Sequence, residues 1–376
     1  MKKNSRRRFI GNIGIGVSAI AMTPILSSFV TKLGRNKNTF NGKKLNIALC
    51  GLGRYANILA EGFESSKYCR LAGIITGTPA KAEKWKTEYK IPDENIYNYQ
   101  NFDAIENNKD IDLVYVVLPN SMHKEYTIRA AEAGKHVIVE KPMALTEKEC
   151  QEMIDACKKA KVQLAVGYRL HYEPHHMEIK RLGQEKVFGQ VHLIEVSLGY
   201  SLADISPSDW HLKKVMAGGG PLMNLGVYCV QAGRYILGEE PISVTAQFGP
   251  VTNTELFSEV EESITWQLNF PSGAVCTSAS SYISNIDRLF ASANKGFFEL
   301  SPAVSYGPFE GRSSIGEFNY PTINQQTAQL DGIGKMILEN KNLPYHISGE
   351  EGLRDMKVIE AIYKVAGTEE KVFIYS

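Results

Sequence analysis

Between Leu45 and residue 169 the chain alternates short apolar runs with amphipathic segments, and this rhythm constrains the fold more than any other feature. Apolar runs of strand length stand at residues 45–50, 69–76, 111–119, 136–140 and 162–169. Segments with helical spacing separate them, at residues 56–65, 79–89, 121–134 and 146–161. Strands that alternate with helices predict right-handed βαβ units and a parallel sheet covered by helices on both faces.

The rhythm changes after about residue 170. A helical segment at 173–185 leads into strand-like runs that have no helices between the later ones. These runs stand at residues 190–201, 242–251, 261–270, 273–283 and 288–300, and a helical segment at 352–366 follows. This pattern predicts an antiparallel sheet in the second half of the chain.

The stretch GLGRYA, directly after the first apolar run, has the glycine spacing of a dinucleotide fingerprint. Gly51 and Gly53 allow a tight turn and close approach to a pyrophosphate, and the small Ala56 lets helix and strand pack closely. The alternative is a plain βα turn. We expect an α/β protein, with an N-terminal Rossmann dinucleotide-binding domain at 45–167 and an α+β domain with a large, mainly antiparallel open sheet at 168–376.

The end of the second apolar run selects the cofactor. NAD sites usually place Asp or Glu there for the ribose hydroxyls, whereas the stretch TGTPAKA offers Thr76, Thr78 and Lys81. Hydroxyls and an ammonium group suit a 2′-phosphate. We therefore expect NADP, with NAD as the alternative if Lys81 is simply a solvated residue at a helix start.

The first 30 residues have the composition of a targeting segment. The residues Ser5-Arg6-Arg7-Arg8-Phe9-Ile10 resemble the twin-arginine pattern S-R-R-x-F-L, and residues 11–30 are uncharged. We expect export to the periplasm by the twin-arginine route, with a signal at 1–30, one candidate cleavage site at 19–21, and a flexible arm at 31–44. A membrane anchor is the alternative, because about 20 uncharged residues can span a bilayer.

The charge distribution argues against nucleic acid and membrane partners, and the spacing of the histidines argues against a metal site. The formal net charge is +1, but residues 1–44 hold ten of the 42 Lys and Arg and none of the 41 Asp and Glu, which leaves −9 for the remainder. An acidic body argues against nucleic acid or an anionic membrane, so membrane contact is expected only through export or an uncleaved signal. His175 and His176 lack a carboxylate or cysteine at ligand spacing, and we expect no metal site.

A charged pair followed by proline ends the fourth apolar run, where Val139 precedes Glu140-Lys141-Pro142. In doubly wound sheets, ligands bind beyond the carboxyl ends of the strands. We expect Lys141 to hydrogen-bond a substrate hydroxyl beside the nicotinamide and Glu140 to orient Lys141. Pro142 would fix the backbone, and a cis bond is one way to do so.

Five motifs in order resemble the Gfo/Idh/MocA oxidoreductase family over residues 45–376: GLGRYA, LPNSMHKE, AGKHVIVEKPMA, VGYRLHYEP and AGGGPLMNLGVY. The likeness is strongest to glucose–fructose oxidoreductases, which also carry twin-arginine signals. The resemblance implies a nicotinamide domain followed by an open sheet domain whose sheet faces the active site. It also implies a homo-oligomer, either a dimer or a tetramer.

The resemblance assigns roles to individual residues. Lys141 matches the substrate-polarising lysine, Tyr228 matches the acid/base tyrosine of glucose–fructose oxidoreductases, and Asn224 stands at a substrate position. The positions that match cofactor contacts are Gly51, Leu52, Gly53, Arg54, Tyr55, Thr76, Lys81, Pro119, Asn120, His123, Glu140, Lys141, Arg169, Trp210 and His211.

Three positions depart from the family pattern. Asn224 replaces a carboxylate, and an amide can hydrogen-bond a sugar hydroxyl but cannot take a proton. His211 replaces an arginine near the cofactor. The arm at 31–44 is short and lacks the prolines with which relatives hold a neighbour's cofactor.

These features predict an exported NADP-dependent oxidoreductase that moves hydride between a glucose-like sugar and a tightly bound cofactor, with a second sugar or ketone as acceptor. Tyr228 would relay the hydroxyl proton, and Lys141 would lower the pKa of Tyr228 and hold the oxygen. One alternative is an NAD-dependent glycoside hydrolase or 3-keto-glycoside-forming enzyme of the same fold. Another, favoured by Asn224, is a sugar-binding protein without turnover.

Overall fold

The computed structural model describes residues 42–202, 205–368 and 372–374. The predicted signal at 1–30, and the predicted arm up to residue 41, lie outside the described residues. No helix within the described ranges combines the length and the apolar character that crossing a membrane requires.

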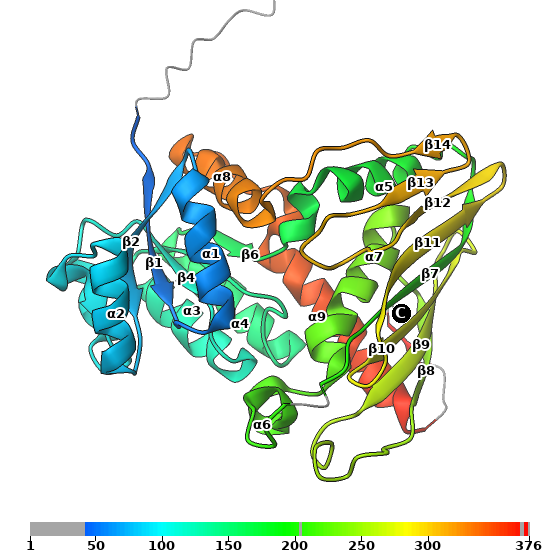
Figure 1. Ribbon diagram of the computed structural model, residues 1–376, viewed down its shortest axis with the longest axis horizontal. Coiled ribbons are helices and arrows are strands. Elements are labelled where there is room, and N and C mark those ends of the chain that lie inside the picture. The colour runs from blue at the N-terminus through cyan, green and yellow to red at the C-terminus, as the bar shows by residue number, and fades with distance from the viewer. Residues whose placement is uncertain (1–41, 203–204, 369–371, 375–376) are drawn as a thin grey trace, which may run out of the picture. The chain divides into compact units, whose positions relative to one another are not determined.

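The first sheet is parallel, with the strand order β3-β2-β1-β4-β5-β6 (Figure 1). Its strands are β1 (Leu45–Cys50), β2 (Cys69–Ile75), β3 (Ile96–Tyr97), β4 (Leu113–Val116), β5 (His136–Val139) and β6 (Leu164–Val166). The helices that connect them are α1 (Arg54–Ser65), α2 (Pro79–Tyr89), α3 (His123–Glu132) and α4 (Glu147–Ala160). The predicted parallel sheet is therefore confirmed. Strand order reverses between β1 and β4, which is the place where such sheets bind ligands.

The second sheet has the order β14-β13-β12-β11-β7-β10-β9-β8-β15. Its strands are β7 (Val191–Gly199), β8 (Ser243–Phe248), β9 (Ser263–Asn269), β10 (Val275–Ser281), β11 (Ile286–Ala293), β12 (Gly296–Leu300), β13 (Gly311–Ser313), β14 (Gly316–Glu317) and β15 (Val372–Phe373). The prediction of a mainly antiparallel sheet is correct, with one exception. Strands β7 and β10 pair in parallel, because the chain forms β8 and β9 before β10 pairs with β7.

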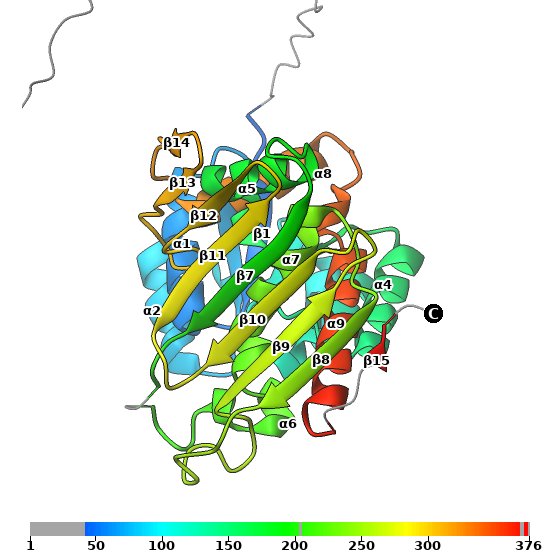
Figure 2. The same ribbon diagram turned by 90° about the vertical axis from the view of Figure 1, so that its right-hand side faces the viewer.

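Helices cover one face of this second sheet. Figure 2 looks onto the other face and shows α5 (Pro174–Gln184), α7 (Val227–Leu237) and α9 (Gly349–Ala366) behind the strands. Helix α9 contacts both β8 and α4, so it joins the second sheet to the first. Two further helices, α6 (Lys214–Ala217) and α8 (Gln325–Leu338), also link the halves: α8 contacts α1, and α6 contacts the turn that follows β4.

Candidate active site

The turn between β1 and α1 is built for close approach of an anion. Gly51 has a φ of +101°, and a Cβ there would lie 2.3 Å from the Val117 carbonyl oxygen, so only glycine fits. A Cβ at Gly53 would meet nothing within 4 Å. No side chain caps the start of α1, and its first turn carries no acidic residue. The free N–H groups and the helix dipole therefore suit a dinucleotide pyrophosphate.

The two glycines are expected to respond differently to alanine. Gly51→Ala should lower the free energy of unfolding by about 1–3 kcal/mol, because the new Cβ meets Val117 and the positive φ is strained. A Cβ at position 53 has room, and the φ of −87° suits alanine, so Gly53→Ala should change the free energy of unfolding by less than ~0.5 kcal/mol. We expect this variant to lower nucleotide affinity instead. Denaturant unfolding and NADP titration of both variants measure this, and equal destabilisation would contradict it.

The end of β2 presents hydroxyls and a cation. Thr76 is buried and its hydroxyl accepts a hydrogen bond of 3.2 Å from the Thr78 N–H. Lys81 is exposed in the first turn of α2, where its N–H donates to the Thr78 carbonyl at 3.0 Å. The structure thus places Lys81 as an accessible cation two residues into the helix that follows β2.

Glu140 is held at the end of β5 by a buried chain of hydrogen bonds. The Gln329 amide of α8 donates to the Tyr115 hydroxyl at 2.7 Å, and that hydroxyl donates to the Glu140 carboxylate at 2.5 Å. Burial raises the pKa of Glu140 to about 7, against the opposing effects of Tyr115 and Lys141. The Glu140 carboxylate interacts with Lys141 in two ways: its charge acts on the Lys141 ammonium group, and it accepts a backbone hydrogen bond from Lys141. No local sequence pattern distinguishes Tyr115 or Gln329, because their contacts with Glu140 and with each other span distant parts of the chain.

Lys141 points toward the segment that carries Tyr228. Its Nζ donates to the backbone carbonyl oxygen of Asn224 at 2.9 Å and lies 4.7 Å from the centre of the Tyr228 ring. Burial lowers the pKa of Lys141 to about 8, and the charge of Glu140 opposes this shift. The Lys141–Pro142 peptide bond is cis. The structure therefore brings together the two residues predicted to be catalytic.

A π-helix supplies the carbonyl that Lys141 contacts. This turn, η6 (Leu222–Gly226), contains Asn224 and runs directly into α7, so Tyr228 stands in the first turn of α7. The Asn224 amide also donates to the Tyr200 hydroxyl at 3.2 Å. The partly buried Glu261 carboxylate anchors the start of the turn by accepting N–H bonds from Gly220 and Leu222. Single π-turns inside helices are frequent at functional sites.

The cation that acts most strongly on the Tyr228 phenol is Arg169. Burial raises the pKa of Tyr228, the charge of Arg169 opposes that rise, and the charge of Glu140 adds to it. The expectation that Lys141 also lowers this pKa stays a prediction. The Lys141 ammonium lies over the ring and bonds to Asn224, whereas Arg169 interacts with the phenol through both charge and a side-chain contact.

Arg169 links three parts of the site. It lies just after β6, is 3% exposed, and donates to the Ser305 carbonyl at 3.3 Å, to the Val304 carbonyl and to the Gln325 side chain of α8. Its guanidinium carbon is 5.4 Å from the Tyr228 ring centre and 4.6 Å from that of Tyr306. Tyr306 was not predicted from the sequence, because nothing in its local pattern distinguishes it from a loop tyrosine.

Two predicted cofactor positions, His123 and Asn120, have side chains that bond to backbone carbonyls and hold neighbouring segments in place. His123 is fully buried, with its ring nitrogens 2.9 Å from the Pro142 carbonyl and 2.8 Å from the Leu118 carbonyl, so it braces the turn after β5 and does not reach the site surface. Asn120 is also buried and donates to the Ala217 carbonyl of α6 at 2.9 Å. It therefore connects the end of β4 to the second half of the chain.

The remaining predicted positions lie at the edges of the site. Trp210 and His211 stack with ring centres 3.8 Å apart, and His211 contacts the Asp209 carboxylate at 2.6 Å. The Tyr55 phenol interacts electrostatically with Glu140, Tyr228 and Arg169, in addition to Tyr306. The positions Leu52, Arg54 and Pro119 follow the carboxyl ends of β1 and β4. Together these residues surround the same end of the first sheet.

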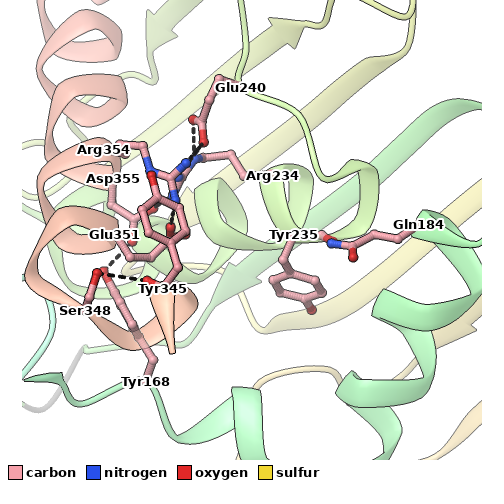
Figure 3. A network of polar contacts seen from close by, with 10 residues as sticks. All are labelled: Tyr168, Gln184, Arg234, Tyr235, Glu240, Tyr345, Ser348, Glu351, Arg354 and Asp355. Atoms are coloured by element: carbon pink, nitrogen blue, oxygen red, sulfur yellow. Dashed lines mark hydrogen bonds and ion pairs between the residues drawn. The ribbon is translucent and has the colours of Figure 1, made fainter. Parts of the chain in front are cut away.

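A buried ionic network fixes the far end of α7 (Figure 3). Arg234 pairs with Glu240 at 2.7 Å, with Glu351 at 2.9 Å and with Asp355, the last two from α9. The Tyr168 hydroxyl donates to Asp355 at 2.5 Å. Because Tyr168 directly precedes Arg169, this network ties α7 and the end of β6 to the same helix. It thereby sets the relative positions of Tyr228 and Arg169.

Two other features lie away from these residues. A hollow of about 750 Å³ on the open face of the second sheet is lined by polar residues that include Thr245, Gln267 and Thr277, and by none of the predicted site residues. In the described ranges no three His, Cys, Asp or Glu side chains gather as a metal site. The expectation that His175 lacks a carboxylate neighbour is wrong, because the Glu173 carboxylate lies 2.8 Å from its ring and also caps α5.

Comparison with known proteins places this geometry in a family. Residues 45–168 match the model of the Gfo/Idh/MocA oxidoreductases with an NAD-binding Rossmann fold, and residues 176–297 match a C-terminal domain model of the same family. The structure of an aldose–aldose oxidoreductase from Caulobacter crescentus, in complex with glycerol, superimposes with a TM-score of 0.85. That protein is 40% identical, and the match covers 88% of this chain and 100% of that one.

Two curated relatives match over nearly their whole length. The D-xylose 1-dehydrogenase [NADP(+)] of Haloarcula marismortui is 25% identical over 89% of this chain and 95% of the relative. The D-glucoside 3-dehydrogenase of Escherichia coli is 27% identical over 89% of this chain and 99% of the relative. The two family models, the matching fold and the arrangement around Lys141 lead to one conclusion: this chain belongs to the Gfo/Idh/MocA family of oxidoreductases.

Proposed function

We propose that this protein is an exported, NADP-dependent oxidoreductase that transfers hydride between an aldose and a retained cofactor, with a second sugar or ketone as acceptor. Its class, an NAD(P)-dependent sugar oxidoreductase, rests on family membership and on its sugar-oxidising relatives. The observation that carries the proposal is the placement of Lys141 beside Tyr228, at the carboxyl end of a strand next to the switch point of the first sheet.

The side chains fit alcohol oxidation. The nicotinamide, when bound, supplies the hydride acceptor. Lys141 would donate a hydrogen bond to the sugar hydroxyl and position its carbon, and Tyr228 would take the hydroxyl proton. Arg169 favours the phenolate that accepts this proton, and it opposes in part the burial that raises the pKa of Tyr228. In the reverse direction, Tyr228 would return the proton to the carbonyl oxygen of the acceptor.

The preference for NADP rests on the end of β2. The stretch from Thr76 to Ala82 contains no carboxylate to bind ribose hydroxyls, and it exposes Lys81. The NADP(+) in the name of the Haloarcula relative is consistent with this preference. The Caulobacter protein is named for a pair of aldoses, which supports an aldose both as hydride donor and as hydride acceptor. We further propose a homo-oligomer, as the family resemblance implies.

Retention of the cofactor follows from export. A twin-arginine signal exports folded proteins, and the periplasm has no free dinucleotide pool, so the enzyme would load its cofactor beforehand and keep it. Purified without added nucleotide and then denatured, the mature protein should release about one NADP per chain. Paired aldoses should then give equal amounts of oxidised and reduced sugar. An empty protein that needs added NADP for every turnover would contradict retention.

Export itself depends on Arg6 and Arg7 in the N-terminal segment. Changing both to lysine should leave the protein in the cytoplasm, because the twin-arginine pattern is lost while the positive charge is kept. Fractionation of cells that express each form measures this. Unchanged recovery from the periplasm would show that another route is used.

The glucoside 3-dehydrogenase relative favours a second candidate, oxidation of a glycoside at C3. The same pair, Lys141 and Tyr228, would serve a secondary hydroxyl as well as an anomeric one. Product analysis separates the candidates, since aldose oxidation at C1 yields a lactone or aldonic acid and C3 oxidation yields a 3-keto sugar.

A further inference from the structure

Several hydrogen bonds anchor the loop after β12. One oxygen of the Asp287 carboxylate in β11 accepts the N–H groups of Ala303 at 2.8 Å and Val304 at 2.7 Å, and its other oxygen accepts that of Ser305 at 3.0 Å. The His176 ring contacts the Ala303 carbonyl at 2.6 Å. Three consecutive backbone groups are thus fixed directly before Tyr306.

Arg169 completes this anchoring from the side of the active site. It donates to the carbonyls of Val304 and Ser305, and it lies against the ring of Tyr306 at 4.6 Å. The same guanidinium approaches Tyr228. Tyr306 is nevertheless 52% exposed. The chain therefore presents a half-exposed aromatic ring, with an anchored backbone before it, close to the acid/base residue.

The surroundings of Tyr306 are those of the site. Its phenol interacts electrostatically with Tyr228, Arg169, Glu140 and Arg54, and burial of its oxygen raises its pKa to about 12. A phenol that stays neutral offers a ring face and a hydrogen-bonding tip without competing as a base. An aromatic face attracts the weakly positive C–H groups on the apolar side of a sugar ring, and a ring fixed in advance loses little entropy on binding.

We propose that Tyr306 is a specificity-determining residue, whose ring stacks against the apolar face of the sugar that Lys141 holds. This inference rests on the proposed function and adds to it a residue that selects pyranose-shaped substrates. It explains why Arg169, Asp287 and His176 all converge on so short a loop. Arg169 then acts as the positioning residue that sets the distance between the stacking ring and the acid/base Tyr228.

Tyr345 provides a matched control. It is 55% exposed and lies against an arginine, Arg354, at 3.9 Å, so its exposure and its partner resemble those of Tyr306. Its interactions are with the Arg234 network, through Arg354, Glu351 and Glu240 (Figure 3). Loss of each ring removes a comparable surface aromatic group, but only the loss at 306 should alter sugar recognition.

The experiment compares Tyr306→Ala, Tyr306→Phe and Tyr345→Ala in the cofactor-loaded full-length protein, with D-glucose and D-xylose as probes. Tyr306→Ala should raise KM about tenfold while kcat changes less than about twofold, because stacking binds ground state and transition state alike. Tyr306→Phe should restore KM to within about twofold, and Tyr345→Ala should match the wild type. Fluorescence titration with each sugar gives the same comparison for binding without turnover.

The outcomes separate the inference from the proposed function. An unchanged KM and an unchanged sugar affinity in Tyr306→Ala overturn the inference while leaving aldose oxidation intact. Loss of kcat together with loss of bound cofactor would also overturn it, since Tyr306 would then be a structural residue. A wild-type protein that neither oxidises nor binds any aldose overturns both proposals. A rise in KM for the sugars in Tyr306→Ala that is absent in Tyr306→Phe and in Tyr345→Ala supports the inference.

Discussion

Replacing Tyr228 with phenylalanine should lower turnover with aldoses by about 10²–10⁴-fold, the usual contribution of a general acid–base group. The change removes the phenol oxygen and keeps the ring against which Lys141 and Arg169 lie at 4.7 Å and 5.4 Å. Cofactor content should therefore stay near that of the wild type. Lys141→Ala should lose at least as much activity, because it removes both the hydrogen bond to the substrate and a cation beside Tyr228.

Steady-state rates and the dinucleotide released on denaturation measure both variants. Tyr320→Phe is a suitable control, because Tyr320 is a partly exposed phenol that packs on His175 and Phe318. Near-normal rates in Tyr228→Phe would mean that another group carries the proton. The phenols of Tyr55, Tyr200 and Tyr306 would then be tested next, since each interacts electrostatically with Tyr228.

Replacing Arg234 with alanine should lower the free energy of unfolding by about 3–5 kcal/mol, because it leaves buried carboxylates without their cation. Arg234 and Asp355 are each 2% exposed in their side chains, and Glu351 is 7% exposed. The loss should also reduce turnover, since α7 carries Tyr228 and is held to α9 by these contacts. Denaturant unfolding with a stable m-value measures the change in stability.

The destabilisation of Arg234→Ala should depend on pH in a defined direction. Burial already raises the pKa of Asp355 to about 7 in the intact protein, and Arg234 opposes that rise. Without Arg234 the pKa rises further, so Asp355 is neutral below it and charged above it. The loss of unfolding free energy in Arg234→Ala should thus be largest well above pH 7 and become smaller as the pH falls.

An exposed arginine with similar partners serves as the control for this network. Arg181 bonds Glu178 at 2.8 Å and Glu185 at 3.0 Å, but its side chain is 44% exposed. Its replacement by alanine should cost about 0–1 kcal/mol, as exposed ion pairs usually do. A loss at Arg234 no greater than that at Arg181 would show that the buried network contributes little to stability.

The sequence alone was sufficient for the features that depend on neighbouring residues. The parallel sheet follows from apolar runs at strand spacing, and the glycine turn follows from two glycines directly after β1. Local residues also cap the start of α4: the Thr146 hydroxyl accepts the Glu149 N–H, and the Glu149 carboxylate accepts the N–H of Leu145. Lys141 could be singled out because a charged pair and proline interrupt an apolar strand.

Tertiary structure decided the features that depend on residues far apart in the chain. Helices α7 and α8 were not predicted. Helix α7 is buried around most of its circumference and therefore has no clear amphipathic period. Its Val, Tyr and Ile residues also favour a strand by composition. The bonds from Lys141 to Asn224, from Tyr115 to Gln329 and from Arg169 to the loop before Tyr306 span 83 to 214 residues. No local pattern encodes such contacts, because packing of the second sheet and its helices against the first sheet creates them. The sequence thus determined the nucleotide fold and the lysine, whereas the fold as a whole decided that Arg169 acts on Tyr228 and that Tyr306 lies beside Arg169.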